Sequence, residues 1–212
     1  MAHATRVLLI DDHAVVREGY RRLLERTPGL AVVGDAATGA EGYRRFVELA
    51  PDVVVMDISL PDVSGIETLR RMRMREPQAR VLVFSIHDEP IFARRALDAG
   101  GRGYLSKSSA PDLLVEAVRA VARGELFVGP DVASALVPGQ GSAAQEPLDA
   151  LSVREFEILR LLAGGESVEE IAHRLSLSVK TVANYQTAIR HKLGARTPTQ
   201  LVHLALRSGL VS

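Results

Sequence analysis

Short apolar runs alternate with longer amphipathic stretches along the first 124 residues of the chain. Runs such as Val7–Ile10 and Val53–Met56 are typical of strands that are buried on both faces of a parallel sheet. This pattern predicts strands near 6–10, 31–34, 53–56, 80–85 and 102–105, and helices near 14–27, 38–49, 64–75, 90–99 and 111–123. Successive strand–helix repeats of this kind predict an α/β domain, a doubly wound parallel sheet with helices on both faces.

The last third of the chain has helical patterns and no strand pattern. Ser152 with Glu155, and Ser167 with Glu170, are capping-box signatures that predict helices near 153–163 and 168–175. A third helix is expected from Ser178 to about residue 193, and Thr197-Pro198 opens a last helix. The second and third of these helices, separated by a short break, form a helix-turn-helix pattern. We therefore expect an all-α domain of four helices.

A stretch rich in Gly, Ser, Ala, Gln and Pro, residues 138–147, separates the two patterns and is typical of a flexible linker. We expect a first domain over 1–124 and a linker over 125–147, with a short helix near 130–137. The second domain is expected over 148–212.

Composition narrows the class of protein. The chain has 212 residues, 47% of them hydrophobic, which supports real cores, and it lacks cysteine, so it has no disulfide and no thiolate metal site. No signal-peptide pattern is seen at the N-terminus, and no apolar stretch approaches the ~20 residues that span a bilayer. We expect a cytoplasmic protein without a membrane partner.

Charge is distributed unevenly although the formal net charge is zero. From Ile171 onward the chain has six Lys or Arg residues and no acidic residue. Such a stretch is either a solvated helix face or the electrostatic footprint of a surface that binds phosphates.

Chemically compatible side chains follow the predicted strands. Asp11 and Asp12 come after the first strand, Asp57 after the third, Ser85 ends the fourth, and Lys107 follows the fifth. An Asp after a strand often only caps the next helix. Ligands of doubly wound sheets bind beyond the carboxyl ends of the strands, however, so we expect these groups to meet at one edge.

Crowded carboxylates repel one another, and Mg²⁺, which prefers oxygen ligands, relieves that repulsion. Asp57 is then available as a nucleophile toward a phosphoryl donor, forming an acyl phosphate. The Lys107 ammonium and the Ser85 hydroxyl can bind the phosphoryl oxygens. The added negative charge would bias any nearby element that has two arrangements.

With the motifs LLIDDHAVVREG, VVVMDISLPDVSGIE, VLVFSIHDE and ALDAGGRGYLSK, residues 4–124 resemble the receiver domain of two-component response regulators. The resemblance implies a flavodoxin-like (βα)5 fold, a sensor histidine kinase as partner, and Asp57 as the phospho-acceptor. It also implies that Asp12 binds Mg²⁺ directly, Asp11 mainly through water, and Ser59 through its backbone carbonyl. The resemblance places Ser85 and Tyr104 at switch positions.

Residues 148–210 resemble a LuxR-type DNA-binding domain through LSVREFEILRLLAGGESVEEIAHRLSLSVKTVANYQTAIRHKLGARTPTQLV. Together the two domains resemble a NarL/FixJ-family regulator, which implies a homodimer on double-stranded DNA. Asn184 suits an adenine and Thr187 a thymine methyl, whereas lysine and arginine suit phosphates. The residues expected at the DNA are Lys180, Thr181, Ala183, Asn184, Tyr185, Thr187, Arg190 and Lys192. Leu201, Leu204 and Ala205 are candidates for a dimer face or for packing inside the domain.

Three functions follow from these residues. The first is a transcription factor controlled by phosphorylation of Asp57. In the second, the protein binds DNA and its first domain serves only as a structural dimerisation module, which the intact acidic set and Lys107 argue against. The third is a phosphatase with an aspartyl-phosphate intermediate. Asp57 is followed by Ile58-Ser59, so the second carboxylate of haloacid-dehalogenase-type phosphatases is missing, and no P-loop pattern occurs.

Overall fold

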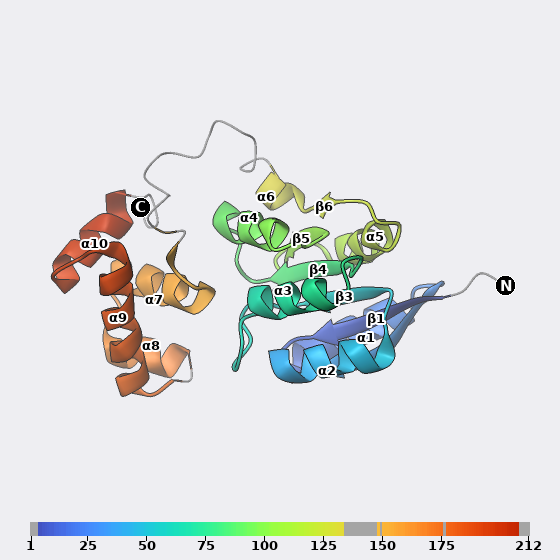
Figure 1. Ribbon diagram of the computed structural model, residues 1–212, viewed down its shortest axis with the longest axis horizontal. Helices are drawn as coiled ribbons and strands as arrows, with labels where there is room; N and C mark the ends of the chain where they lie inside the picture. Colours follow the sequence, from blue (N-terminus) through green and yellow to red (C-terminus); the bar gives the residue numbers. More distant parts are fainter. Residues whose placement is uncertain (1–3, 134–147, 149, 176, 208–212) are drawn as a thin grey trace. The chain divides into compact units, whose positions relative to one another are not determined.

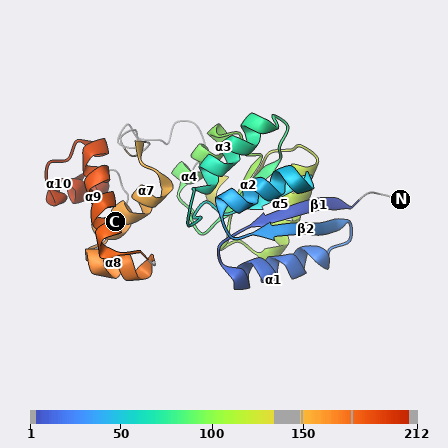
Figure 2. The ribbon, with the colours of Figure 1, turned by 60° about the horizontal axis from the view of Figure 1, so that its bottom comes forward.

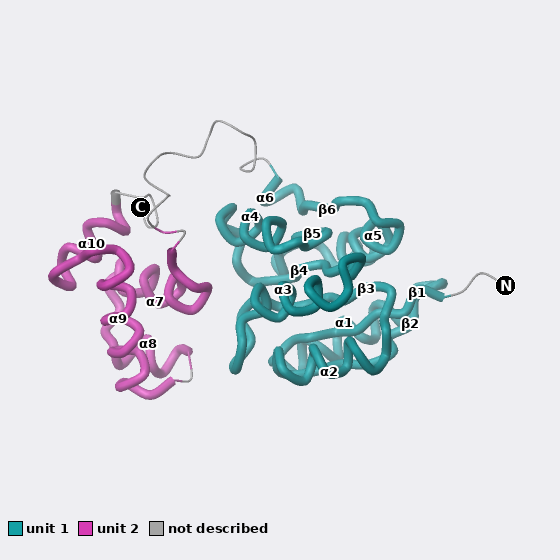
Figure 3. Tube along the Cα trace, viewed as in Figure 1, with its two compact units in different colours: residues 1–137 teal, residues 138–212 magenta. Residues whose placement is uncertain are grey.

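The computed structural model describes residues 4–133, 148, 150–175 and 177–207 of the chain. The chain divides into two compact units, Met1–Val137 and Pro138–Ser212, which are coloured separately in Figure 3.

The first unit is a parallel sheet with the strand order β2-β1-β3-β4-β5-β6 (Figure 1). Its strands are β1 (Thr5–Ile10), β2 (Leu30–Ala36), β3 (Val53–Met56), β4 (Val81–Ser85), β5 (Gly103–Ser106) and β6 (Phe127–Val128). Its helices are α1 (Ala14–Glu25), α2 (Gly39–Leu49), α3 (Gly65–Arg75), α4 (Pro90–Asp98), α5 (Pro111–Ala122) and α6 (Pro130–Ala133). The predicted α/β class, with its alternating strands and helices, is confirmed.

Helices cover both faces of this sheet. Helices α2, α3 and α4 contact one another in sequence, and Figure 2 shows α1 on the opposite side of the sheet from α2. The core between the sheet and the α1/α5 layer includes Leu9, Val55, Phe84, Leu24 and Leu114, all buried. Because the central strands are buried on both faces, their sequences read as continuous apolar runs rather than alternating ones.

Strand β6 and helix α6 extend this unit beyond the segment expected as its end. Val128 of β6 lies beside Tyr104 of β5, and α6 contacts β5 and α4. Residues 127–133, which lie in the segment expected as a linker, thus pair with or pack on the edge of the sheet. The predicted short helix is seen over Pro130–Ala133, and the remainder of its expected range, together with 138–147, lies outside the described residues.

The second unit contains the four predicted helices, α7 (Val153–Ala163), α8 (Val168–Arg174), α9 (Val179–Leu193) and α10 (Pro198–Arg207). Ser152 and Ser167 each form a complete capping box, with Glu155 and Glu170 respectively. Ser178 accepts a hydrogen bond from the backbone N–H of Thr181 and so caps α9. These local bonds, rather than long-range packing, fix where the helices begin. The predicted all-α domain is confirmed.

No helix in the described ranges has both the length and the apolar character needed to cross a bilayer.

Candidate functional site

The carboxyl ends of four strands meet at one edge of the sheet. The backbone N–H of Asp57 donates to the carbonyl of Ile10 over 2.8 Å, and that of Lys107 donates to the carbonyl of Ser85 over 2.7 Å. These bonds continue the ladders β1–β3 and β4–β5 by one residue beyond the strands, so the side chains that follow the strands become neighbours. The expectation that these groups share one edge is confirmed.

Lys107 is the centre of the site. Its Nζ lies 2.6 Å from Oδ2 of Asp11 and 2.5 Å from Oδ2 of Asp57, and all three side chains are at least nine-tenths buried. Burial by itself lowers the pKa of the Lys107 ammonium, but the charges of Asp57 and Asp11 outweigh burial and raise it. The ammonium therefore neutralises part of the negative charge of two buried carboxylates.

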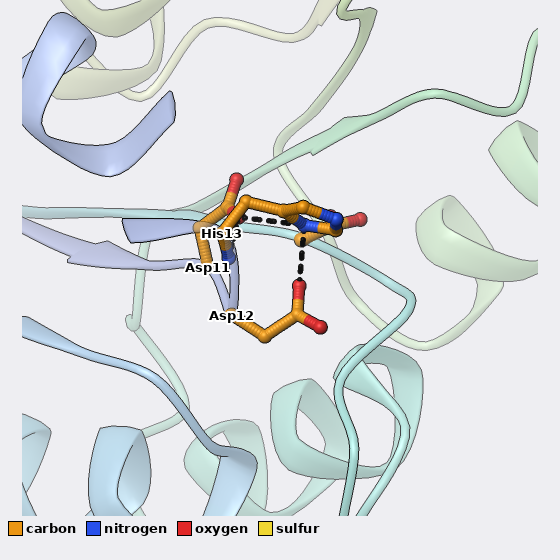
Figure 4. Close-up of side chains that lie close together, drawn as sticks. Asp11, Asp12 and His13 are labelled. Carbon is orange, nitrogen blue, oxygen red and sulfur yellow. Dashed lines mark hydrogen bonds and ion pairs between the residues drawn. The ribbon is translucent and has the colours of Figure 1, made fainter. Parts of the chain in front are cut away.

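Asp12 and His13 form the outer rim of the same site (Figure 4). Nδ1 of His13 lies 2.7 Å from Oδ1 of Asp12 and 3.5 Å from Oδ1 of Asp11. One ligand atom from each of Asp11, Asp12, His13 and Asp57 can be chosen so that all lie within 4.8 Å of one another. Three of these groups are carboxylates, the oxygen donors that Mg²⁺ prefers, so the residues fit this ion. His13 belongs to the motif LLIDDHAVVREG, and sequence reasoning assigned it no role.

Arg17 supports the site from α1. Its Nη1 donates to the backbone carbonyl of Asp11 over 2.5 Å, and its Nε donates to Oδ2 of Asp35 over 2.7 Å. Arg21 pairs with the other oxygen of Asp35. Sequence reasoning missed this network, although the spacing of Arg17 and Arg21 by one helical turn places them on one face of α1.

Gly65 at the start of α3 lets the backbone pass close to Asp57. A Cβ at this position would lie 2.1 Å from the carbonyl oxygen of Asp57, closer than any real contact. The amide of Gly65 also donates to the carbonyl of Ile58 over 2.8 Å. A larger residue here would therefore displace the backbone that carries the Asp57 carboxylate.

The two predicted switch residues are both fully buried. Tyr104 points inward, and its hydroxyl donates to the backbone carbonyl of His87 over 2.7 Å. The backbone N–H of His87 in turn donates to Oγ of Ser85 over 3.3 Å. Burial raises the pKa of the Tyr104 hydroxyl strongly, against a smaller opposing effect of a hydrogen bond with Ser85. The β4–α4 connection is thus attached to both residues.

Ser59 follows Asp57 by two residues, and its side chain contacts the β4–α4 connection. Its Oγ is 2.9 Å from Nε2 of the buried His87 ring, and its backbone N–H donates to Oδ1 of Asp57 over 3.2 Å. The ring of His87 also packs on Phe92, with ring centroids 4.5 Å apart. The Ser59 hydroxyl therefore joins the Asp57 loop to the β4–α4 connection, and the His87 ring joins that connection to α4.

Helix α9 presents most of the residues expected at DNA on its surface. Val182 and Ile189 are buried in the unit, and Lys180, Ala183, Asn184 and Thr187 are exposed; Thr181, Tyr185 and Arg190 are half-buried. A helix with one buried and one exposed face that follows a short break has the form required for insertion into a major groove.

Lys192 already has a partner inside the unit. Its Nζ lies 2.6 Å from Oε2 of Glu155, a buried carboxylate that also closes the capping box of α7. Burial raises the pKa of Glu155, but its hydrogen bonds with Lys192 and Ser152 outweigh burial and hold the pKa below its ordinary value. Lys192 thus connects α9 to α7.

On α10 the structure separates the three residues expected at a dimer face. Leu201 and Ala205 are buried, and α10 packs on α7, so these two side chains belong to the core of the unit. Leu204 is half-buried, and Leu206, which sequence reasoning did not select, is 46% exposed. An amphipathic pattern identified the apolar face of α10 but not which of its residues remain at the surface.

Comparison with protein families matches both units. Residues 7–119 match the response regulator receiver domain, and residues 149–205 match the bacterial regulatory proteins of the luxR family. The chain is 42% identical over 209 residues to the transcriptional activator protein ExaE of Pseudomonas putida, covering 97% of each chain. It is 36% identical to the response regulator UvrY of Escherichia coli, covering 96% of this chain and 94% of that protein.

Solved structures show the same similarity. A LuxR-family two-component response regulator from Aurantimonas sp. SI85-9A1 is 48% identical with a TM-score of 0.61, over 62% of this chain and 94% of that one. The structure of the response regulator RcsB in complex with DNA is 28% identical with a TM-score of 0.60, over 98% of this chain and 100% of that one.

Proposed function

This chain belongs to the response regulators that join a receiver domain to a LuxR-type DNA-binding domain, and we propose that it is a transcription factor whose sequence-specific DNA binding is controlled by phosphorylation of Asp57. The observation that supports this function best is the paired contact of Lys107 with Asp11 and Asp57. Such an arrangement holds a nucleophilic carboxylate beside a cation that can bind a phosphoryl group.

In the proposed reaction an Oδ atom of Asp57 attacks the phosphorus of a sensor histidine kinase's phosphohistidine. The new O–P bond forms as the P–N bond breaks, and the imidazole leaves with a proton from solvent. Lys107 would then bind a phosphoryl oxygen, and the Ser85 hydroxyl would bind another. Because Ser85 and Tyr104 are both attached to His87, movement of Ser85 would change the environment of Tyr104.

Asp12 and Asp57 would hold Mg²⁺, with Asp11 acting through water and the Ser59 carbonyl as a further ligand. The ion would supply positive charge to the phosphoryl oxygens and orient them for the in-line displacement. The Lys107 ammonium contacts Oδ2 of Asp11 and Oδ2 of Asp57, whereas Oδ1 of each accepts only a backbone N–H, from His13 and Ser59 respectively, among the hydrogen bonds of the described residues. Each carboxylate can therefore contact the Lys107 ammonium and a metal ion at the same time.

The second domain would read double-stranded DNA with α9. Asn184 and Thr187 are exposed one turn apart and would face base edges together with Ala183, whereas Lys180 and Arg190 would contact phosphates. Thr181, Tyr185 and Lys192 lie at the margin of this surface. Two copies of the domain on adjacent half-sites would bind more tightly than one through effective concentration. We propose a homodimer on DNA and a cytoplasmic location.

A gel-shift titration of the full chain tests this function, with and without acetyl phosphate as a small phosphodonor and with Mg²⁺ present. We expect phosphorylation to increase affinity for the operator and to favour a complex with two copies of the chain. Asp57→Asn is the control, since it removes the nucleophile without changing the volume of the site. Equal affinity and stoichiometry under both conditions would contradict control by phosphorylation, and the absence of phosphate on Asp57 would contradict its role as acceptor.

A further inference from the structure

The β3–α3 loop, residues 57–64, is bonded at its tip to a second helix. Oδ1 of Asp62 accepts the backbone N–H of Gly39 over 2.8 Å, and Oδ2 of Asp62 accepts that of Ala40 over 2.9 Å. Gly39 and Ala40 are the first two residues of α2. One carboxylate therefore binds two adjacent amides with both of its oxygens and joins segments that are distant in the sequence.

Helix α2 has a cap of its own. Its N-cap is Thr38, whose side-chain oxygen accepts the backbone N–H of Glu41 over 3.2 Å. Such a cap leaves the amides of the first two helical residues open, and they lie at the positive end of the helix dipole. These are the two amides that Asp62 binds. The contribution of Asp62 is therefore the attachment of the loop to α2.

The start of α2 and the loop also lie in close contact. A Cβ on Gly39 would lie 2.5 Å from Oγ1 of Thr68 and 2.9 Å from the carbonyl oxygen of Val63, closer than real Cβ contacts. Burial raises the pKa of Asp62, but the hydrogen bonds that it accepts from the backbone N–H groups of Ala40, Val63 and Gly39 outweigh burial and lower the pKa. The carboxylate is thus held as the ionised acceptor of these bonds.

At its base the loop reaches the acidic site. The backbone N–H of Ser59 donates to Oδ1 of Asp57 over 3.2 Å. The backbone N–H groups of Leu60 and Gly65 both donate to the carbonyl of Ile58, over 3.0 Å and 2.8 Å. These bonds close the base of the loop, whereas Asp62 holds its tip.

We propose that Asp62 is a positioning residue for phosphorylation: by fixing the tip of the β3–α3 loop on α2, it keeps the Ser59 carbonyl where the cation of the acidic site binds. Without Asp62 the loop would have to be ordered when the ion binds, and that loss of conformational freedom would weaken ion binding. This inference rests on the cation site of the proposed function and adds a residue that does not contact the ion.

The first test measures the loop itself, by hydrogen–deuterium exchange of the unphosphorylated full chain in EDTA. We expect Asp62→Ala to speed exchange of the amides of Leu60 and Gly65 by roughly 5-fold or more, because the loop opens more often once its tip is released. Glu41→Gln is the matched control. Oε2 of Glu41 accepts the backbone N–H of Ala37 over 3.3 Å at the same end of α2, without contact to the loop, so this variant should leave loop exchange unchanged.

The second test follows phosphorylation by acetyl phosphate over a series of Mg²⁺ concentrations. Asp62→Ala should raise the Mg²⁺ concentration that gives the half-maximal rate by roughly 3- to 10-fold, because it loosens the support of one ligand. The rate at saturating Mg²⁺ should stay within about 2-fold of the wild type, because the bound ion restores the order of the loop. Asp62→Asn, which keeps one acceptor oxygen, should lie between the two.

Three outcomes overturn the inference and leave the proposed function intact. They are unchanged loop exchange in Asp62→Ala, an unchanged half-saturating Mg²⁺ concentration, and an equal Mg²⁺ shift in Glu41→Gln. A purely structural role of Asp62 would lower the rate equally at every Mg²⁺ concentration, and that result also overturns it. A wild type that shows no Mg²⁺-dependent phosphorylation overturns the proposed function instead.

Discussion

Arg17 of α1 holds the backbone of Asp11 in place: its Nη1 donates to the Asp11 carbonyl oxygen over 2.5 Å. The same guanidinium is fixed by Asp35 of β2, so its planar group bridges two strands from one helix. Asp11 contributes one of the two carboxylates around Lys107. The orientation of the acidic site therefore depends on a side chain that does not contact its carboxylates.

Replacing Arg17 should impair the site more than replacing its neighbour Arg21. Both arginines bind Asp35, but only Arg17 is bonded to Asp11. We expect Arg17→Met to slow phosphorylation by acetyl phosphate roughly 10-fold, because a small misplacement of reacting groups is costly. Its free energy of unfolding should fall by about 1–2 kcal/mol. Single-turnover kinetics and denaturant unfolding of both variants measure this, and equal rates for Arg17→Met and Arg21→Met would refute it.

Removing Lys107 should destabilise the receiver domain and make it depend on a divalent cation. Lys107→Met leaves Asp11 and Asp57 buried with no ammonium between them, which should cost about 3 kcal/mol. Mg²⁺ should then raise the melting temperature of the variant more than that of the wild type. Calorimetric scans in EDTA and in Mg²⁺ measure the difference. Lys180→Met, at an exposed lysine, is the control and should behave as the wild type does.

Tyr104→Phe should lower stability by an amount that shrinks at high pH. The variant loses the hydrogen bond from the Tyr104 hydroxyl to the carbonyl of His87, at a cost of about 1 kcal/mol at neutral pH. The folded pKa of Tyr104 is raised above the unfolded value of 10.0, so its contribution is complete below pH 10 and declines as pH rises above it. Denaturant unfolding of both chains between pH 8 and pH 11 (roughly one unit beyond that pKa) measures this. A difference that stays constant over this range would contradict the assignment.

Glu155→Gln should destabilise the DNA-binding domain at neutral pH but not in acid. The folded pKa of Glu155 lies below its unfolded value of 4.5, so the ionised group stabilises the fold above that pH and loses this effect as pH falls through the folded pKa. The expected loss is about 1 kcal/mol at pH 7, because the amide keeps the cap but loses the Lys192 ion pair. Helical circular dichroism during thermal unfolding at pH 7 and at pH 3 (about one unit or more below the usual Glu pKa) checks it.

Glu170→Gln is the matched control for that variant. Glu170 closes the same kind of capping box on α8, but it is exposed and pairs with no lysine in the described part of the chain. Its substitution should change stability less than Glu155→Gln does. Equal losses would mean that the cap, rather than the Lys192 ion pair, carries the effect.

The parts of this structure that local sequence determines were predictable. Asp57 and Lys107 directly follow apolar runs, and parallel topology alone brings such positions to one sheet edge. Ser152 and Ser167 predict where α7 and α8 begin, because each capping serine and its Glu partner are three residues apart in the sequence. Both signals depend on spacing along the chain, so no knowledge of distant contacts is needed.

Features that depend on distant contacts were not predictable. Strand β6 has two half-buried residues, too few to show a period. Lys192 was expected at DNA, and its partner Glu155 lies 37 residues away. The amphipathic pattern of α10 could not tell that Leu201 faces the core. His13 was overlooked because its neighbours Asp11 and Asp12 accounted for the motif.

The short edge strand β6 has a mechanical consequence. Gly129 donates its backbone N–H to the carbonyl of Tyr104 over 2.8 Å, and Val128 lies beside Tyr104 in the sheet. The chain that leads out of the receiver is thus bonded, at β6 and Gly129, to the strand that carries Tyr104. A displacement of β5 would therefore be passed to β6, and helix α6 directly follows β6 in the chain.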